Sequence, residues 1–473
     1  MIYAIATVLN RAVNIILLPI YTRYLTKVEY GTLEILVVSS NVLLIVMQFG
    51  LGSALFRNYL YKKNPNKKTL ISTAYYTLAI ISIIFSIILL TFSNNLSLLL
   101  FSSIKFTNAL RSFILFSLFQ TLTIIPMTKL RIEERSGKFA LIAGANFLLV
   151  LLLNLLFIYH FNLGINGIAY ANAIASLIFF IVYFIIINKD LILSFSFTEL
   201  KDMFEFGIPL IPASLFSMIL MMSDRYLVKY YLGLEKVAIF GVALRIGTIM
   251  GLAVTSFQKT WPAVMFKIAK EKNGSLVFAR LFTIFILLLI TFGMIIILFS
   301  NEIITIFTTP KYLEANSLIP FIIISFIFYG VNYFTSIGIQ VKKKTYFYPI
   351  IIGIAAIINI SLNIFLLPLY GIKAAAFSRF ISFFILSNSI LLISLKYYRI
   401  KYEVKKLIIL TIISCFLGFI GYNLYIEHFI LNIIIKFLLI VIFLITMILF
   451  NIINIDLIKK LKSKIINIAN NSK

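Results

Sequence analysis

The sequence has little charge, one cysteine and two histidines. Only 12% of its 473 residues are charged, whereas a soluble domain carries about 25%. Cys415 is the single cysteine, which excludes a disulfide within the chain, and we expect it to be a packing residue. His160 and His428, expected at outer helix ends, are too few for a metal site of the His/Cys type. A soluble fold is therefore excluded, and neither a metal nor another cofactor is expected.

Two sequence signals found in other classes of protein are also missing. No segment reads G-x-x-x-x-G-K-[ST], so transport driven by nucleotide hydrolysis within this chain is excluded. Residues 1–18 lack a basic stretch ahead of their apolar residues, so no cleavable signal peptide is expected. The first helix is therefore expected to direct membrane insertion itself.

Long apolar runs dominate what is present, and 62% of the residues are hydrophobic. Many runs reach the roughly 20 residues that cross the hydrocarbon of a bilayer. Because every backbone polar group must be satisfied inside lipid, runs of this length are helices. The sequence predicts an all-α, polytopic transmembrane bundle of about fourteen spans, near residues 2–22, 32–55, 70–92, 108–127, 139–159, 164–187, 207–230, 237–258, 276–299, 317–340, 346–367, 372–395, 407–425 and 431–454.

The net charge of +26 comes from basic residues gathered in alternate connectors. One set, from 57–68 through 129–138 to the tail 459–473, holds most of the Lys and Arg. Lys and Arg mark cytoplasmic loops, so both termini are predicted to be cytoplasmic and the number of spans even. The charge is thus a topology signal that also attracts anionic lipid heads, and nucleic acid is not an expected partner.

An internal duplication divides the predicted helices into two lobes. Residues 164–175 match 371–382 at Gly, Ile, Ala and Ile, and 25–31 resemble 232–241. Each copy contains six helices, so the two lobes share one orientation and flank a substrate path near the bilayer midplane. We expect two pseudo-symmetric lobes, 1–190 and 191–400, followed by 401–473 with two further helices and a basic cytoplasmic tail.

Five segments carry a resemblance to a known family. They are 17–31, 50–57, 206–212 (FGIPLIP), 223–245 and 369–376. In this order they resemble the polysaccharide transporter family, the O-antigen and capsule repeat-unit flippases of the multidrug/oligosaccharidyl-lipid/polysaccharide exporter superfamily. The resemblance implies a non-enzymatic flippase of the bacterial plasma (inner) membrane. Its implied partners are undecaprenyl-pyrophosphate-linked glycan, the lipid bilayer and the polysaccharide polymerase or chain-length machinery.

Basic residues inside the predicted spans are the candidate substrate-binding residues. A mid-membrane Arg costs about 2.5–3.5 kcal/mol on insertion scales, so it normally faces a cavity or a partner. Guanidinium groups bind phosphate oxygens bidentately and stay charged, which suits a pyrophosphate bridge. The residues predicted to line a cationic cavity are Arg11, Arg245, Arg379, Arg225 and Arg57.

Some of these basic residues also have a structural interpretation. Asp224 and Arg225 are adjacent and would neutralise each other, and Arg57 would reach the interface by snorkelling. Glu34 and Lys436 are expected at the membrane interface.

Prolines in the first helix of each predicted lobe suggest bending during transport. They are Pro19 in the first lobe and Pro209 and Pro212 in the second. Because proline frees a carbonyl and kinks a helix, these three residues are assigned a structural or gating role. Asp224 is assigned to the same class as the neighbour of Arg225.

Two other functions remain open. A multidrug cation antiporter of the same superfamily needs buried carboxylates, whereas the first helix offers Asn10, Arg11 and Asn14. A membrane polysaccharide polymerase or ligase usually carries a large outer loop, and the largest outer connector here spans only 300–316.

Overall fold

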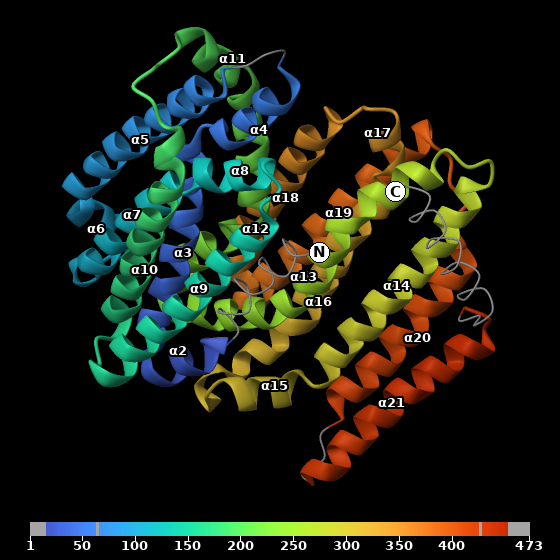
Figure 1. Cartoon of the computed structure of the whole chain (residues 1–473). Coiled ribbons are helices and arrows are strands. Elements are labelled where there is room, and N and C mark those ends of the chain that lie inside the picture. The colour runs from blue at the N-terminus through green and yellow to red at the C-terminus, as the bar shows by residue number, and fades with distance from the viewer. Residues whose placement is uncertain (1–15, 63–65, 425–427, 453–473) are drawn as a thin grey trace. The chain divides into compact units, whose positions relative to one another are not determined.

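The computed structural model describes residues 16–62, 66–424 and 428–452, and nearly all of them are helical (Figure 1). Within these ranges there is no strand, and thirteen helices are long and apolar enough to cross a membrane. The predicted helix 2–22 lies mostly outside the described residues. The all-α, multi-pass bundle of about fourteen spans is therefore confirmed. The chain divides into two compact units, residues 1–241 and 242–473.

The first unit is built from eleven described α-helices and the start of a twelfth. In it α7 packs against α3, α5 and α10, while α11 packs against α4 and α5. The helices are α2 (Leu18–Tyr24), α3 (Lys27–Gln48), α4 (Leu51–Tyr61), α5 (Lys67–Thr91), α6 (Ser93–Phe101), α7 (Thr107–Leu122), α8 (Ile124–Ile132), α9 (Ser136–Leu155), α10 (Gly164–Ile187), α11 (Phe197–Gly207), α12 (Leu210–Leu232) and the start of α13 (Leu234–Ile268).

The predicted single helix 32–55 is wrong, because the chain breaks between α3 and α4. Phe49 and Gly50 adopt left-handed backbone conformations, with φ of 47° and 70°. At the break the backbone of Gly50 touches that of Gly207, where α11 ends: a Cβ added to Gly50 would lie 2.4 Å from the Gly207 carbonyl oxygen. Only glycine permits this combination of positive φ and close backbone approach.

The second unit holds the rest of α13 and eight further α-helices. In it α19 packs against α16 and α18, and α14 packs against α16 and α20. An aromatic cluster stabilises its interior, with the Trp261 and Phe334 rings 4.1 Å apart and Trp261 Nε1 donating to the Tyr333 carbonyl at 2.9 Å. The helices are α14 (Gly274–Leu298), α15 (Ser300–Phe307), α16 (Ile319–Thr335), α17 (Ile337–Val341), α18 (Phe347–Tyr370), α19 (Ile372–Tyr397), α20 (Val404–Asn423) and α21 (Phe429–Leu449).

The segments that match in sequence share two local features. Gly164 at the start of α10 and Gly371 just before α19 both have positive φ, 54° and 63°. Asn154 before the first copy and Asn363 before the second are both fully buried. A glycine in this conformation lets a new helix begin directly after the preceding one. The division into lobes 1–190 and 191–400 with an appended 401–473 stays a prediction.

Candidate functional site

Arg225 of α12 forms a buried ion pair with Glu34 of α3, in the first unit. The Arg225 Nε atom lies 3.0 Å from Glu34 Oε2, and the side chain of Arg225 is 13% exposed. Glu34, expected at the membrane interface, is instead enclosed by protein and 2% exposed. Sequence reasoning did not find this partner, because 191 residues separate the two side chains.

Glycine and two hydroxyl groups shape the surroundings of this pair. A Cβ on Gly241 would lie 2.6 Å from Glu34 Cγ, so the carboxylate side chain packs directly on the glycine. The hydroxyls of Ser39 and Tyr226 lie 2.8 Å apart and also join α3 to α12, with Tyr226 directly after Arg225 in the chain. Asp224, next to Arg225, is fully buried as well. The pair therefore neutralises Arg225 inside a tightly packed contact between two helices.

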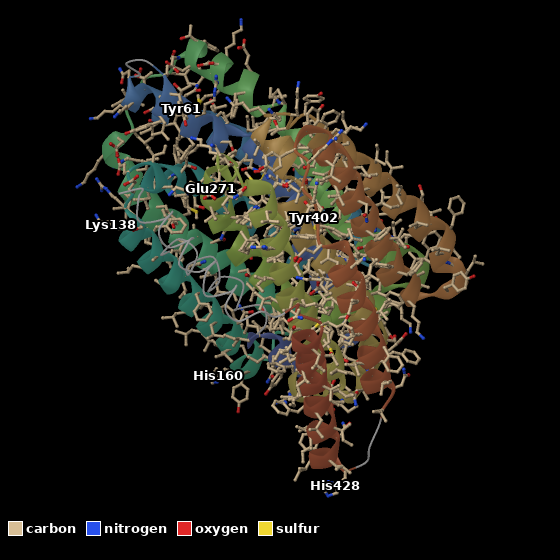
Figure 2. All side chains as sticks on the ribbon, turned by 90° about the vertical axis from the view of Figure 1, so that its right-hand side faces the viewer. Tyr61, Lys138, His160, Glu271, Tyr402 and His428 are labelled. Atoms are coloured by element: carbon tan, nitrogen blue, oxygen red, sulfur yellow. The ribbon has the colours of Figure 1, made fainter. Side chains whose placement is uncertain are left out.

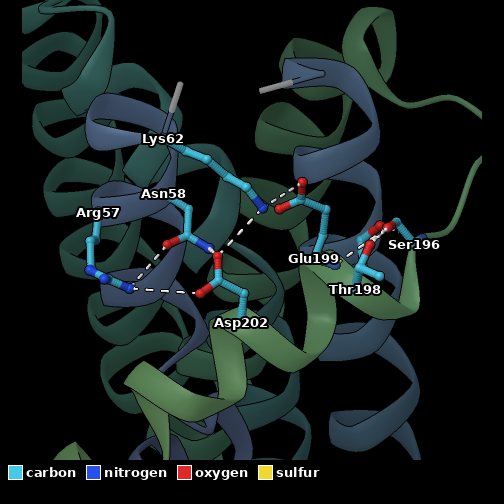
Figure 3. A network of polar contacts seen from close by, with 8 residues as sticks. Arg57, Asn58, Lys62, Ser196, Thr198, Glu199 and Asp202 are labelled. Carbon is cyan, nitrogen blue, oxygen red and sulfur yellow. Dashed lines mark hydrogen bonds and ion pairs between the residues drawn. The ribbon is translucent and has the colours of Figure 1, made fainter. Parts of the chain in front are cut away.

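Arg57 lies near the end of α4, in an exposed polar network with α11 (Figure 3). Its guanidinium lies 4.0 Å from Asp202 Oδ1 and 4.8 Å from the ring centroid of Phe206. The side chain is 48% exposed. This position fits the predicted snorkelling and equally leaves the guanidinium accessible to a ligand.

Lys62 completes the network around Arg57. Its Nζ atom lies 2.9 Å from Glu199 Oε1 and 3.5 Å from Asp202 Oδ2. The hydrogen bond to Glu199 raises the pKa of Lys62. A lysine whose pKa is higher in the folded protein than in the unfolded chain stabilises the fold at any pH below its ordinary pKa. This stabilisation is lost only when the pH rises through the raised pKa. The contact is therefore fully formed at neutral pH.

We expect Asp202→Asn to lower the free energy of unfolding by less than about 1 kcal/mol. Exposed ion pairs are screened by water, and their coupling is typically about 0.2–1 kcal/mol. Denaturation of the detergent-solubilised protein at low and high salt tests this, and the difference from the original protein should shrink at high salt. A loss of several kcal/mol would show that α11 depends on this network.

Arg245 and Arg379 are both buried within predicted spans of the second unit. Arg245 on α13 is 8% exposed, and Arg379 on α19 is 2% exposed. The guanidinium of Arg379 lies 5.1 Å from the Phe383 ring centroid and 5.6 Å from that of Phe326. Aromatic faces attract a cation through their quadrupole, so the two rings hold Arg379 in place.

Two glycines of α13 pack against the same aromatic ring that contacts Arg379. Cβ atoms added to Gly247 and Gly251 would lie 2.9 Å and 3.0 Å from the ring of Phe326. The ring that contacts Arg379 therefore also packs on the α13 backbone, within two turns of Arg245. Arg11, the remaining predicted residue, lies outside the described residues.

The predicted prolines stand at helix starts rather than in helix interiors. Pro19 lies in the first turn of α2, Pro209 is the N-cap of α12, and Pro212 follows in the first turn of α12. Proline is tolerated there because the first-turn N–H groups have no partner within the helix. Among the described helices, the interior prolines are Pro262 of α13 and Pro368 of α18. A gating role for the predicted set stays a prediction.

A buried cluster on α21 is a feature that sequence reasoning missed. Lys436 Nζ lies 2.5 Å from Glu302 Oε1, and Asn432 Nδ2 donates to the same oxygen at 2.8 Å. Lys436, expected at the membrane interface, is therefore in a buried pair that fastens α21 to α15. Asn432 and Lys436 are four residues apart in an otherwise apolar helix, and this spacing is the signal that was available.

A largely apolar groove of about 490 Å³ lies in the second unit. Its walls come from α14, α16, α19 and α20, and include Ile290, Ile324, Leu391 and Cys415. Cys415, expected as a packing residue, is exposed and lines the groove. The groove therefore offers a mainly hydrocarbon-like surface along a membrane-spanning helix.

The two histidines lie at helix ends. His160 ends the short π-helical turn after α9, and His428 is the N-cap of α21 (Figure 2). Across the residues that the structure describes, no group of three or more His, Cys, Asp or Glu side chains is arranged to hold a metal.

Residues 20–317 match the family described as "Polysaccharide biosynthesis protein". The chain belongs to this family. The match includes Arg57, Arg225 and Arg245, whereas Arg379 lies beyond it. No curated protein matches the chain in sequence.

Solved structures show which fold this family member adopts. The lipid II flippase MurJ in an inward-closed conformation superposes with a TM-score of 0.77 at 18% identity, covering 96% of this chain and 99% of that chain. An inward-facing multidrug resistance MATE family transporter of the MOP superfamily superposes with a TM-score of 0.67 at 17% identity, covering 82% of this chain and 93% of that chain. A MOP superfamily transporter from Pyrococcus furiosus superposes with a TM-score of 0.57 at 15% identity, covering 83% of this chain and 92% of that chain. The predicted superfamily fold is thus confirmed.

Proposed function

We propose that the protein is a flippase for undecaprenyl-pyrophosphate-linked oligosaccharide repeat units. It moves them from the cytoplasmic to the outer leaflet of the bacterial plasma membrane for surface polysaccharide such as O-antigen or capsule. The observation that carries the proposal is that a member of a polysaccharide biosynthesis family buries two guanidiniums, Arg245 and Arg379, in membrane-spanning helices. Each such residue costs about 2.5–3.5 kcal/mol to insert, a cost that a role along an anion path explains.

The guanidiniums are suited to the pyrophosphate of the substrate. Arg is always protonated and offers a planar fork that binds two phosphate oxygens at once. Phe326 and Phe383 surround Arg379 with low-dielectric material, which strengthens its attraction for an anion. In this proposal Arg11, Arg57 and Arg245 also bind the anionic head during its passage, while Arg225 is neutralised by Glu34 and holds α12 in place.

The groove of the second unit is suited to the isoprenoid tail. Its apolar walls replace lipid contacts at little cost, since a hydrocarbon chain gains about as much from protein as from lipid tails. Arg379 and the groove residue Ser387 are both on α19, eight residues and about 12 Å apart along the helix. A head group at Arg379 and a tail in the groove are therefore within reach of one lipid molecule.

Alternating access by rocking of the two predicted lobes completes the proposed cycle. We further propose that both termini lie in the cytoplasm and that the polymerase or chain-length machinery receives the product outside. Outward movement of the anionic head follows a membrane potential that is positive outside. It gains about 2.3 kcal/mol per charge per 100 mV, a driving force that does not itself require an ion-antiport site.

A deletion strain complemented with single variants tests the proposal. Leaflet-resolved labelling should find lipid-linked repeat units accumulating on the inner leaflet of the deletion strain, and the original gene should restore export. We expect Arg11→Ala, Arg245→Ala and Arg379→Ala to reduce surface polysaccharide by at least about tenfold at normal protein levels. The reason is that a charge-assisted hydrogen bond contributes about 1.5–3 kcal/mol.

Controls separate the proposal from its rivals. Lys105→Ala, a change in an exposed connector, should leave export unchanged. Normal export by all three Arg variants would contradict the cationic path. Accumulation on the outer leaflet would instead identify a polymerase or ligase, and normal export in the deletion strain with new drug sensitivity would identify an antiporter.

A further inference from the structure

Two helix breaks meet in the first unit and leave a cavity between them. The α3–α4 break at Phe49 and Gly50 touches the α11–α12 break at Gly207, backbone against backbone. The cavity beside this contact measures about 280 Å³. Its lining comes from the end of α3, the first turn of α4 and the first two turns of α12.

The described residues that line this cavity are uncharged, and several are polar. Gln48, Ser53, Ser214 and Ser217 supply one carboxamide and three hydroxyls, and Ile45 and Leu210 supply apolar wall. This composition differs from that of the groove in the second unit, which is largely apolar. The cavity also lacks the positive charge of the candidate Arg residues. It is therefore suited to a part of the ligand that is neither the hydrocarbon tail nor the anionic phosphate.

The polar groups of the cavity are open to a ligand. Ser214 Oγ donates to the Leu210 carbonyl at 2.9 Å and Ser217 Oγ to the Ala213 carbonyl at 2.8 Å. Their protons are therefore engaged and their lone pairs remain as acceptors. Within the described part of the chain, the side chains of Gln48 and Ser53 form no hydrogen bond. The cavity thus presents both donors and acceptors, as a polyol with several hydroxyls requires.

Arg57 continues this site along α4. Ser53 and Arg57 are four residues apart on the exposed face of the helix, which separates them by about 6 Å along its axis. The side chain of Arg57 is half-exposed and its guanidinium is directed toward α11 by Asp202. An uncharged polar cavity beside an accessible guanidinium matches a sugar joined to a phosphate.

We propose that this cavity binds the first sugar of the lipid-linked repeat unit, the one attached to the pyrophosphate, with Arg57 beside the phosphate. The inference rests on the flippase function proposed above. Pockets for drug-sized ligands measure about 300–1,000 Å³, so a cavity of about 280 Å³ takes one monosaccharide ring rather than the whole repeat unit. Gln48 and the three serines bind its hydroxyls, and Ile45 and Leu210 contact its C–H faces.

Binding of matched lipid probes to the full-length protein in nanodiscs tests the subsite. The probes are undecaprenyl pyrophosphate alone and the same lipid carrying glucose, galactose or N-acetylglucosamine. The original protein should bind at least one sugar-bearing probe about tenfold more tightly than the bare lipid. Gln48→Leu and the double variant Ser214→Ala/Ser217→Ala should each remove most of this difference while leaving the affinity for the bare lipid unchanged.

Two further variants show whether the effect is local. Thr91→Ala removes a hydroxyl that donates to the carbonyl of Ile87 at 2.9 Å, the same kind of bond outside the cavity, and should keep the preference. Arg57→Ala should lower the affinity for bare and sugar-bearing probes by the same factor, since both contain the pyrophosphate. Thermal unfolding of each variant reports whether it is folded.

The outcomes distinguish the subsite from the function. Equal affinity of the original protein for bare and sugar-bearing lipids overturns the subsite and leaves the flippase proposal standing. A sugar preference that survives in both cavity variants also overturns the subsite. Failure of the original protein to bind any of the lipids overturns the proposed function itself.

Discussion

Arg225→Leu is expected to lower the free energy of unfolding by about 3–5 kcal/mol, which is the typical cost of removing one member of a buried ion pair. Glu34 would remain between α3 and α12 at 2% exposure, having lost the guanidinium 3.0 Å away. Gly241 packs directly against the Glu34 side chain, so the carboxylate has little room on this side to move to another position. Unfolding in mixed detergent micelles, followed by circular dichroism, measures the loss.

A double-mutant cycle isolates the Arg225–Glu34 interaction. Glu34→Leu should be destabilising as well, whereas the double variant Glu34→Leu/Arg225→Leu should be less destabilised than the sum of the two, since it removes both charges of the pair together. Arg225→Lys keeps the charge and should fall between the original protein and Arg225→Leu. Additive losses in the double variant would show that the two side chains do not stabilise each other.

Gly50→Ala is expected to lower the free energy of unfolding by about 2–5 kcal/mol. A residue other than glycine at positive φ costs roughly 1–2 kcal/mol, and overpacking a close contact costs about 1–3 kcal/mol more. Both apply, because Gly50 has φ of 70° and its new Cβ would meet the Gly207 carbonyl oxygen at 2.4 Å. The same unfolding measurement gives the loss, and a surface polysaccharide assay shows whether the α3–α4 break is needed for export.

A glycine in open space provides the matched control for Gly50. Gly137 lies in α9, and a Cβ there would meet nothing within 4 Å. Gly137→Ala should therefore be neutral or stabilise the helix by about 0.5–1 kcal/mol. If Gly50→Ala behaves like Gly137→Ala, the backbone contact between the two helix breaks does not exist in the protein.

Helix positions were largely predictable, because a span reveals itself through the length of one apolar run. The helix predicted at 164–187 is α10, Gly164–Ile187, and the one predicted at 372–395 is α19, Ile372–Tyr397. Both have sharp starts, since a glycine at positive φ precedes or opens the helix. The failure at 32–55 has a physical cause as well. Nothing in a local run of apolar residues shows that a backbone 157 positions later approaches Gly50 and requires a break.

The candidate site was predictable only as a set of residue types. Arg residues in apolar runs are visible in the sequence because hydrocarbon excludes charge. Their partners are not visible. Arg225 has an adjacent carboxylate in Asp224, yet the described ion pair joins it to Glu34, and Lys436 pairs with Glu302, which precedes it by 134 residues. The neutral cavity at Gln48 gave no signal, since serine and glutamine are ordinary in membrane helices.

By itself, the sequence determined that this protein spans a membrane many times as helices, since so little charge and such long apolar runs leave no other way to satisfy the backbone. Its motifs also pointed to the polysaccharide family. Tertiary structure decided which buried charges neutralise each other, where helices break and which polar side chains surround a cavity. These depend on contacts between residues far apart along the chain, and the energy of such contacts is set by packing and burial rather than by local composition.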